Sequence, residues 1–441
     1  MFTRNTTPLT LCLTGVGWLA LASILGLAML VGLVRSTPVA PWVRTLHVHA
    51  VLVGGVTQIV LGGLLLLISS PRSDDRRESA SHPLTFWAMN GGVIGMLVGF
   101  WLHHSTVIGI AGLVVMAAYG SVVSTLGIRI HDGWKTSFIQ PWSYVLALGG
   151  LLSGVICGEV AAMGLLSESY GYLRLAHIHL VLLGFVVLAL LGLMHQILPT
   201  VWNRPFLNPR MMQAAMTVIP IGVTLLIGGF LRSSILTEMA AGALLFTGMV
   251  LLIINLFRTW FSSDHHGSAA SDHLLVGTFF LTVTVLLGVA LAANHVSSPP
   301  ALAYGRLHLI AYTHMTFIGF ILSAIMGILS HLIPIVLATT RSTSVKKREP
   351  YLDQLNRIMD RGRTIQISTL GFGTMGLGIL AALTWNVPLT SPSVRIAMWS
   401  CFGLLLTSII LFSVKLTTVF AKKPEALATP HSSADELKLT A

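Results

Sequence analysis

The apolar stretch Ala176–Trp202, AHIHLVLLGFVVLALLGLMHQILPTVW, decides the fold that we expect for this chain. It exceeds the roughly 20 mostly apolar residues that a helix needs to cross a bilayer. Two histidines, His177 and His179, lie near its start. An ionisable side chain inside a spanning helix is costly and is by default a candidate for function. The stretch therefore predicts a membrane helix that carries chemistry.

The rest of the chain has the same character. Of its 441 residues, 54% are hydrophobic and only 9% are charged, whereas charged residues make up about a quarter of soluble domains. Twelve segments are long and apolar enough to span a membrane: 10–34, 44–70, 83–102, 104–127, 141–165, 173–199, 210–231, 235–259, 273–293, 305–337, 365–385 and 394–420. The first lacks a small-residue cleavage site, so we expect it to be retained. We therefore predict an all-α polytopic membrane bundle of about twelve transmembrane helices, one domain over residues 1–441, with a polar cytoplasmic tail at 422–441.

The net charge of +11 reflects topology rather than nucleic-acid binding. With the N-terminus inside, 20 of the 26 lysines and arginines fall on the cytoplasmic side and 6 fall outside. This asymmetry is typical of the positive-inside rule. We expect an integral protein of the inner membrane of a prokaryote, with both termini cytoplasmic.

The longest cytoplasmic connection contains an amphipathic stretch. Its apolar face is formed by Leu352, Leu355, Ile358 and Met359, and basic residues flank it: Arg341, Lys346, Lys347, Arg348, Arg357, Arg361 and Arg363. Such a helix is expected to lie on anionic lipid. Docking of a partner protein is the less favoured interpretation.

An internal repeat relates the second, sixth and tenth spans. LHVHAVLVGG from Leu46 and AYTHMTFIGF from Ala311 match AHIHLVLLGF from Ala176, which aligns three histidines, three glycines and a later proline in each copy: His49, His179 and His314; Gly54, Gly184 and Gly319; Pro71, Pro199 and Pro334. A recurrence every four spans predicts three pseudo-repeats of four helices. Their limits are about 1–130, 131–262 and 263–421.

The repeated histidines are predicted to form one layer near the outer face. At a rise of 1.5 Å per residue they lie ~7 to 12 Å below three arginines taken as interfacial markers, Arg44, Arg174 and Arg306. His47 and His177 precede two of them by two residues. A layer of this kind favours ligation of a metal or haem, and the alternative is a structural layer of hydrogen bonds.

Imidazole is an axial ligand of haem iron, and one histidine from each of two helices can hold a low-spin haem. Neutral imidazole also suits copper, so His177 and His179 are candidate copper ligands with help from another helix. The single cysteines Cys12, Cys157 and Cys401 form no C-x-x-C-H pattern, which disfavours covalent haem attachment. We therefore expect non-covalent haem b, with a second haem and copper as further candidates.

On these residues the chain resembles subunit I of the haem-copper oxidase and nitric oxide reductase superfamily, as a divergent, C-type oxidase-like member. Arg44-Thr-Leu-His47 is similar to the low-spin haem segment of the C-type oxidases. Ala176–Trp202, with H-x-H and Leu-Pro-x-x-Trp, is similar to their tenth-helix segment but occupies the sixth span here. The resemblance implies a low-spin haem held by His314 and by His47 or His49.

Two departures affect the expected activity. Tyr312 stands where the superfamily has the ligand of its high-spin haem, and span seven, which should supply two copper ligands, contains no histidine. We therefore expect no oxygen reduction by the usual haem-copper route. A nitric-oxide-responsive haem and copper membrane family of similar size is a second relative, but its W-H-A-H-E-M signature is absent.

Further candidates lie near the same outer face. His308, His295, His103 and His104 are candidates for completing a copper site, and the plainer interpretation is that they are interfacial histidines in contact with water. Glu159 is the one intramembrane carboxylate, with a proton-relay or metal-neighbour role set against a structural one. Tyr312 and Glu159 are the only candidates for catalysis.

The leading interpretation is a haem-binding respiratory redox protein that transfers electrons through a bis-histidine low-spin haem. Reduction of a small gas, nitric oxide or oxygen, at a non-standard second centre is a candidate additional activity. As an enzyme it would be an oxidoreductase of the terminal oxidase or nitric oxide reductase type. The expected partners are membrane lipid, other respiratory subunits, a donor such as cytochrome c or quinol, and a small gas. A haem- or copper-binding sensor without turnover and a proton-coupled transporter are the alternatives.

Overall fold

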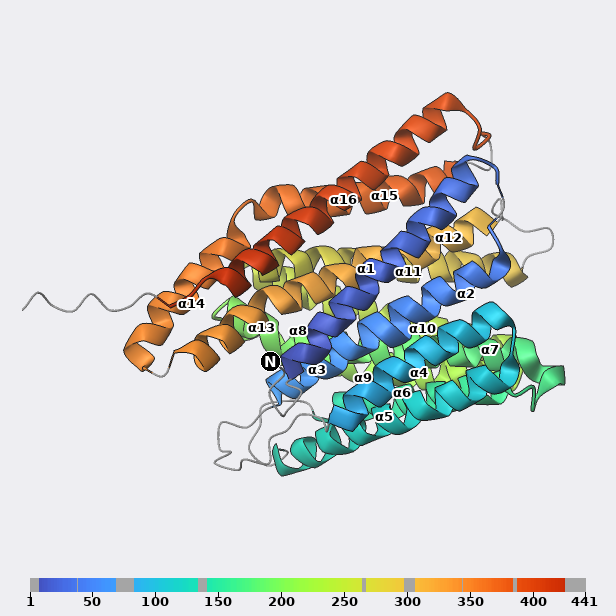
Figure 1. Ribbon diagram of the computed structural model, residues 1–441, viewed down its shortest axis with the longest axis horizontal. Helices are drawn as coiled ribbons and strands as arrows, with labels where there is room; N and C mark the ends of the chain where they lie inside the picture. Colours follow the sequence, from blue (N-terminus) through green and yellow to red (C-terminus); the bar gives the residue numbers. More distant parts are fainter. Residues whose placement is uncertain are drawn as a thin grey trace, which may run out of the picture.

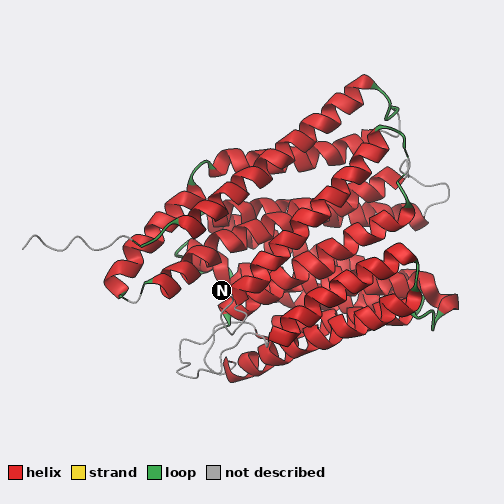
Figure 2. Ribbon diagram, in the orientation of Figure 1, coloured by secondary structure: helices red, strands yellow, loops and turns green. Residues whose placement is uncertain are grey.

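The computed structural model describes residues 8–37, 39–68, 83–133, 141–263, 267–296, 306–342, 344–383 and 387–424. Within these ranges the chain is helical with short connections and contains no strand (Figure 2). The prediction of an all-α membrane bundle is confirmed, because twelve helices in these ranges are long and apolar enough to cross a membrane. The predicted tail lies outside the described residues beyond residue 424.

We group the helices by the three repeat units that the sequence predicts. Unit 1 contains α1 (Pro8–Val34), α2 (Pro41–His49), η1 (Ala50–Val56), α3 (Thr57–Leu67), α4 (Pro83–Leu102) and α5 (Ser105–Gly133). Unit 2 contains α6 (Pro141–Ala162), the short η2 (Ser167–Ser169), α7 (Tyr170–His179), η3 (Leu180–Val187), α8 (Leu188–Val201), α9 (Pro209–Leu231) and α10 (Ile235–Phe261). Unit 3 contains α11 (Ala269–Val296), α12 (Arg306–His314), η4 (Met315–Leu322), α13 (Ser323–Arg341), α14 (Val345–Asp360), α15 (Arg363–Leu383) and α16 (Pro392–Ala421). Six of these helices begin at a proline, a residue whose fixed φ suits the first turn of a helix.

The three spans that carry the repeat form the centre of the bundle, and we call them the inner spans. Each consists of three consecutive elements, α2–η1–α3, α7–η3–α8 and α12–η4–α13. In their most apolar stretches 72, 67 and 78% of residues are buried, against 11–44% in the other nine spans. The inner spans contact one another through α3, α8 and α13. The histidine-bearing helices α2, α7 and α12 extend toward the opposite end of the bundle (Figure 1).

Both ends of the described chain lie at the same end of the bundle, as an even number of spans requires (Figure 1). We call this the inner end, and the opposite one the outer end. The helix α14 also lies at the inner end.

Each inner span changes from α-helix to π-helix directly after its repeat histidine. The π-helical segments η1, η3 and η4 span 7, 8 and 8 residues. π-Helix is rare, usually limited to single turns, and frequent at functional sites. Tyr119 of α5 donates its hydroxyl to the Val53 carbonyl inside η1, which satisfies a backbone acceptor there. π-Helix therefore follows the repeat histidine in all three inner spans, which marks this level of the bundle as a candidate functional layer.

The structure corrects the expectation for the amphipathic stretch. It forms α14 as predicted, but its apolar face packs against α13 and α16 rather than lying on lipid. Leu355 and Met359 are fully buried, and Leu352 and Ile358 pack partly buried against the same core. Tyr351 also binds the Lys422 carbonyl at the end of α16.

A buried polar chain joins four helices at the inner end. Lys415 of α16 donates to the Met359 carbonyl at 2.8 Å and to Oε1 of Gln366 at 2.6 Å. Gln366 of α15 in turn bonds Nε2 of His273 on α11 at 2.8 Å. Buried polar groups stabilise a fold only while they are paired. The chain therefore holds α11, α14, α15 and α16 together.

We predict that Lys415→Met lowers the free energy of unfolding by about 1–3 kcal/mol, because it leaves two buried acceptors without a donor. Thermal or denaturant unfolding in detergent measures the effect. Lys423→Met, at an exposed position just beyond α16, is the matched control and should change little. Equal stability of the two variants would show that the chain does not hold these helices.

Candidate functional site

The candidate site is the layer of imidazoles in the outer halves of the inner spans. α2 ends at His49, α7 at His179 and α12 at His314, so each repeat histidine is the last residue before a π-helical segment. His47 and His177 lie two residues earlier in the same helices. The predicted layer is therefore present, with its five rings at matching positions of three helices.

The three repeat histidines each bond the preceding turn of their own helix. Nδ1 of His49 lies 2.9 Å from the Thr45 carbonyl, Nδ1 of His179 lies 2.8 Å from that of Leu175, and Nδ1 of His314 lies 2.8 Å from that of Ile310. In every case the acceptor is four residues earlier, which fixes the ring relative to its helix.

His47 and His177 instead bond the first span of their own unit. Nδ1 of His47 lies 2.8 Å from the Ala22 carbonyl of α1, and Nδ1 of His177 lies 2.7 Å from the Gly154 carbonyl of α6. A glycine four residues further along makes room for each ring. A Cβ on Gly26 would lie 2.9 Å from Cε1 of His47, and a Cβ on Gly158 would lie 2.8 Å from Cε1 of His177.

In each unit, three positions of the first span, spaced four residues apart, contact the inner span. The first packs against the repeat glycine, and the third faces the residue two before the repeat histidine. In chain order the three positions are Trp18, Ala22 and Gly26 in unit 1, Gly150, Gly154 and Gly158 in unit 2, and Phe280, Thr284 and Gly288 in unit 3. In unit 3 the residue facing the third position is Tyr312, whose ring would lie 3.3 Å from a Cβ on Gly288. Tyr312 is thus the structural counterpart of His47 and His177.

The hydrogen bonds of Nδ1 determine which ring nitrogen of each histidine is available to bind a metal. A carbonyl oxygen only accepts a hydrogen bond, so each Nδ1 must carry the proton. A neutral imidazole then has its lone pair on Nε2. A backbone carbonyl that accepts a hydrogen bond from the other ring nitrogen is the usual support of a metal-ligating histidine. All five rings are therefore prepared to ligate through Nε2.

The rings are surrounded by protein, yet each keeps accessible surface. Each of the five is neither fully buried nor freely exposed. His314 lies within electrostatic range of His47, and His49 lies within electrostatic range of His177. Each of these interactions relates imidazoles of two different units, and we call the two combinations the His47–His314 pair and the His49–His177 pair.

Aromatic rings support two of the repeat histidines. The Phe100 ring of α4 lies 4.5 Å from the ring of His49, and the Phe230 ring of α9 lies 4.8 Å from that of His179, measured between centroids. The two contacts are tilted by 44° and 50° and span the same number of residues, another sign of the repeat.

Glu159 lies in the outer part of α6 beside Gly158. Its carboxylate rests on Gly112 of α5, where a Cβ would overlap it, and Oε2 has no hydrogen-bond partner among the described residues. The residue is 9% exposed. An enclosed carboxylate without a partner is costly to ionise. The proton-relay or metal-neighbour role of Glu159 stays a prediction.

The candidate copper ligands do not converge in the described part of the chain. His177 faces α6 while His179 faces α9, as expected for residues two apart on a helix. Among the described residues no three His, Cys, Asp or Glu side chains come together as a metal group. His103 and His104 are exposed at the outer end, and the side chains of His295 and His308 lie outside the described residues.

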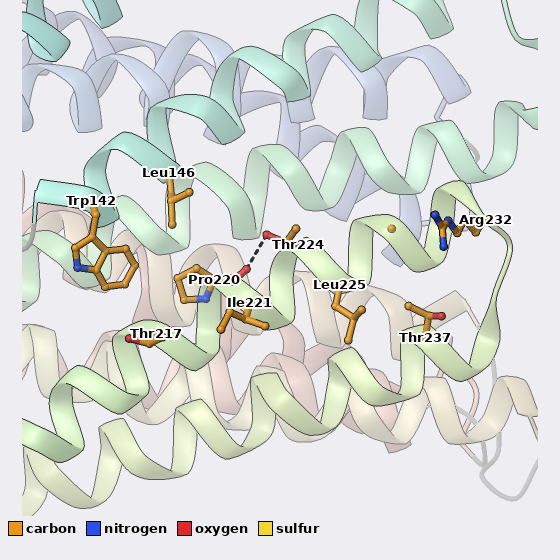
Figure 3. Close-up of a pocket in the computed structure, with 10 residues that line it drawn as sticks. Trp142, Leu146, Thr217, Pro220, Ile221, Thr224, Leu225, Arg232 and Thr237 are labelled. Atoms are coloured by element: carbon orange, nitrogen blue, oxygen red, sulfur yellow. Dashed lines mark hydrogen bonds between the residues drawn. The ribbon is translucent and has the colours of Figure 1, made fainter.

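A groove on the flank of the bundle is separate from this layer. It runs along α9 between α6 and α10, with Trp142 toward one end and Arg232 at the other (Figure 3). Its lining is mostly apolar and includes no histidine. Thr224 donates to the Pro220 carbonyl at 2.9 Å and so presents little free polarity. The groove therefore contributes nothing to the imidazole site.

The repeat histidines and Tyr312 were found from the sequence, whereas their supports were not. The carbonyls of Ala22 and Gly154 belong to helices whose sequences show no obvious repeat, and any residue type has a carbonyl. The glycines Gly26, Gly158 and Gly288 are a usable signal in hindsight, because they recur at a similar distance before the inner span. His273 was overlooked because it lies outside the repeat.

We predict that Gly158→Ala displaces the His177 ring and weakens its bond to the Gly154 carbonyl. The ¹⁵N signal of Nδ1 in histidine-labelled protein should then shift at His177. Gly149→Ala, on the same helix with nothing within 4 Å of an added Cβ, is the matched control. An unshifted His177 signal in Gly158→Ala, or a proton on Nε2 in the unaltered chain, would contradict the geometry.

Comparison with known proteins adds no family to this description. A scan against protein-family models finds no match, and a search of curated proteins also finds none. The functional argument therefore rests on the imidazole layer itself.

Proposed function

We propose that this chain is a haem-binding integral membrane protein that transfers electrons through a low-spin haem held by His47 and His314. The observation that carries the proposal is the pair itself. The two imidazoles come from different units, lie within electrostatic range and each keep Nε2 for a ligand. Two such imidazoles on separate helices are the usual axial ligands of a low-spin haem.

The residues around the pair fit this cofactor. The absent side chain of Gly26 lets the His47 ring lie against α1, and α3 and α13 contact each other below the layer. Arg44, one turn outward from His47, offers a cation for the carboxylates of a haem. Of the two alternatives in the sequence, His47 is favoured over His49, because His49 is the neighbour of His177.

Bound haem would supply one-electron oxidation and reduction. The chain's own contribution is to fix both rings by their Nδ1 bonds. A ring held in one orientation requires little rearrangement when its iron changes charge. Electron transfer is therefore the activity that this arrangement suits best.

Reduction of a gas at a second centre is the weaker proposal. In unit 3 the structural counterpart of His47 and His177 is Tyr312. The described residues also contain no group of three metal-binding side chains. His177, His179 and His308 stay the candidate copper ligands, and the side chain of His308 lies outside the described residues. A haem sensor would use the same pair, whereas a proton-coupled transporter would need histidines that remain free to titrate.

The proposed setting is the inner membrane of a prokaryote, with the inner end of the bundle facing the cytoplasm. The support is the excess of lysine and arginine on that side, which includes the exposed Arg361 and Lys423. Lipid surrounds the outer spans, many of whose large apolar side chains are exposed. An electron donor such as a quinol or cytochrome c, and further respiratory subunits, belong to the same proposal.

We predict that His314→Ala abolishes the low-spin spectrum of the haem held by this pair. The haem would lose one of its two histidine ligands, and added imidazole should restore part of the signal. His179→Ala removes the matching residue of unit 2 and should leave this haem unchanged. Reduced optical spectra of the purified variants test this. An unchanged spectrum in His314→Ala would contradict the assignment.

A further inference from the structure

We infer that His49 and His177 form a second axial pair for haem, at the boundary between units 1 and 2. The inference rests on the proposed function, since it assumes that haem is the cofactor of the imidazole layer. It adds a cofactor site with its own ligands, distinct from the pair formed by His47 and His314.

The two boundaries are built in the same way. Between units 3 and 1, His47 is tied to the first span of unit 1 and His314 is tied to its own helix. Between units 1 and 2, His177 is tied to the first span of unit 2 and His49 is tied to its own helix. Each pair thus combines a ring bonded to a neighbouring helix with a ring bonded to its own helix. The two rings come from inner spans of successive repeat units. A site that suits one ligand at the first boundary should suit it at the second.

The local surroundings also match. Gly158 gives His177 the same room that Gly26 gives His47. Arg174 precedes His177 by three residues, as Arg44 precedes His47, so both boundaries offer a cation one turn outward. The centroid of the Phe100 ring lies 4.5 Å from that of the His49 ring, and the Nδ1 bond of His49 keeps its Nε2 available. A layer that serves hydrogen bonding alone does not explain these features, because Nε2 of His49 and of His177 would then have nothing to bind.

The repeat also predicts where such a site is absent. At the third boundary, between units 2 and 3, the corresponding residues are Tyr312 and His179. A phenol is a much rarer haem ligand than an imidazole, so a six-coordinate low-spin haem is not expected there. His179 is therefore an internal control, because it resembles His49 in its Nδ1 bond and its aromatic neighbour but lacks an imidazole partner.

The test is the number of haems per chain in the full-length protein. The chain and its variants are supplied with haemin during expression and purified in detergent, and haem is measured by pyridine haemochrome against protein concentration. The unaltered chain should bind two haems. His49→Ala and His177→Ala should each bind one, with the haem of His47 and His314 retained as proof of folding. His179→Ala should still bind two, and His177→Ala/His314→Ala should bind almost none.

Each other outcome has a definite meaning. One haem per chain that is lost in His314→Ala, and is unaffected by His49→Ala and His177→Ala, would overturn the second pair and leave the first standing. Copper that is lost in His177→Ala without a change in haem would also overturn it. A chain without any haem would overturn the proposed function as well.

Discussion

The bond from each imidazole Nδ1 to a backbone carbonyl is the interaction on which the candidate site depends. It sets the tautomer, fixes the orientation of the ring and leaves Nε2 as the reactive atom. Two of the five acceptors, the carbonyls of Ala22 and Gly154, belong to a neighbouring helix. The positions of α1 and α6 therefore determine where His47 and His177 point. A shift of either helix would alter the site without changing any ligand.

This dependence explains much of the architecture around the layer. The inner spans pack tightly where α3, α8 and α13 meet, and they carry their histidines above this contact. The switch to π-helix directly after each repeat histidine widens the helix between the two regions. Glycines in the first spans then allow the rings to lie against α1 and α6. The other nine spans are less buried and enclose this centre.

The sequence predicted the number and the approximate limits of the spans because hydrophobic length is a property of single segments. It also predicted the layer, since the repeat aligned His49, His179 and His314. The resemblance set His314 against His47 or His49, but the sequence could not choose between these two or relate His49 to His177. Both depend on how three helices are arranged around a common centre. The face of α14 was assigned to lipid because an amphipathic pattern does not distinguish lipid from a neighbouring helix, and α13 and α16 cover it instead.

The central claim, that the imidazole layer binds low-spin haem, is tested most directly by the reduced-minus-oxidised optical spectrum of the purified, unaltered chain, recorded with and without carbon monoxide. The account predicts sharp, resolved bands of a low-spin haem that carbon monoxide leaves unchanged, because both axial positions are occupied by imidazole. A spectrum without haem bands, or a high-spin haem that binds carbon monoxide, would contradict it.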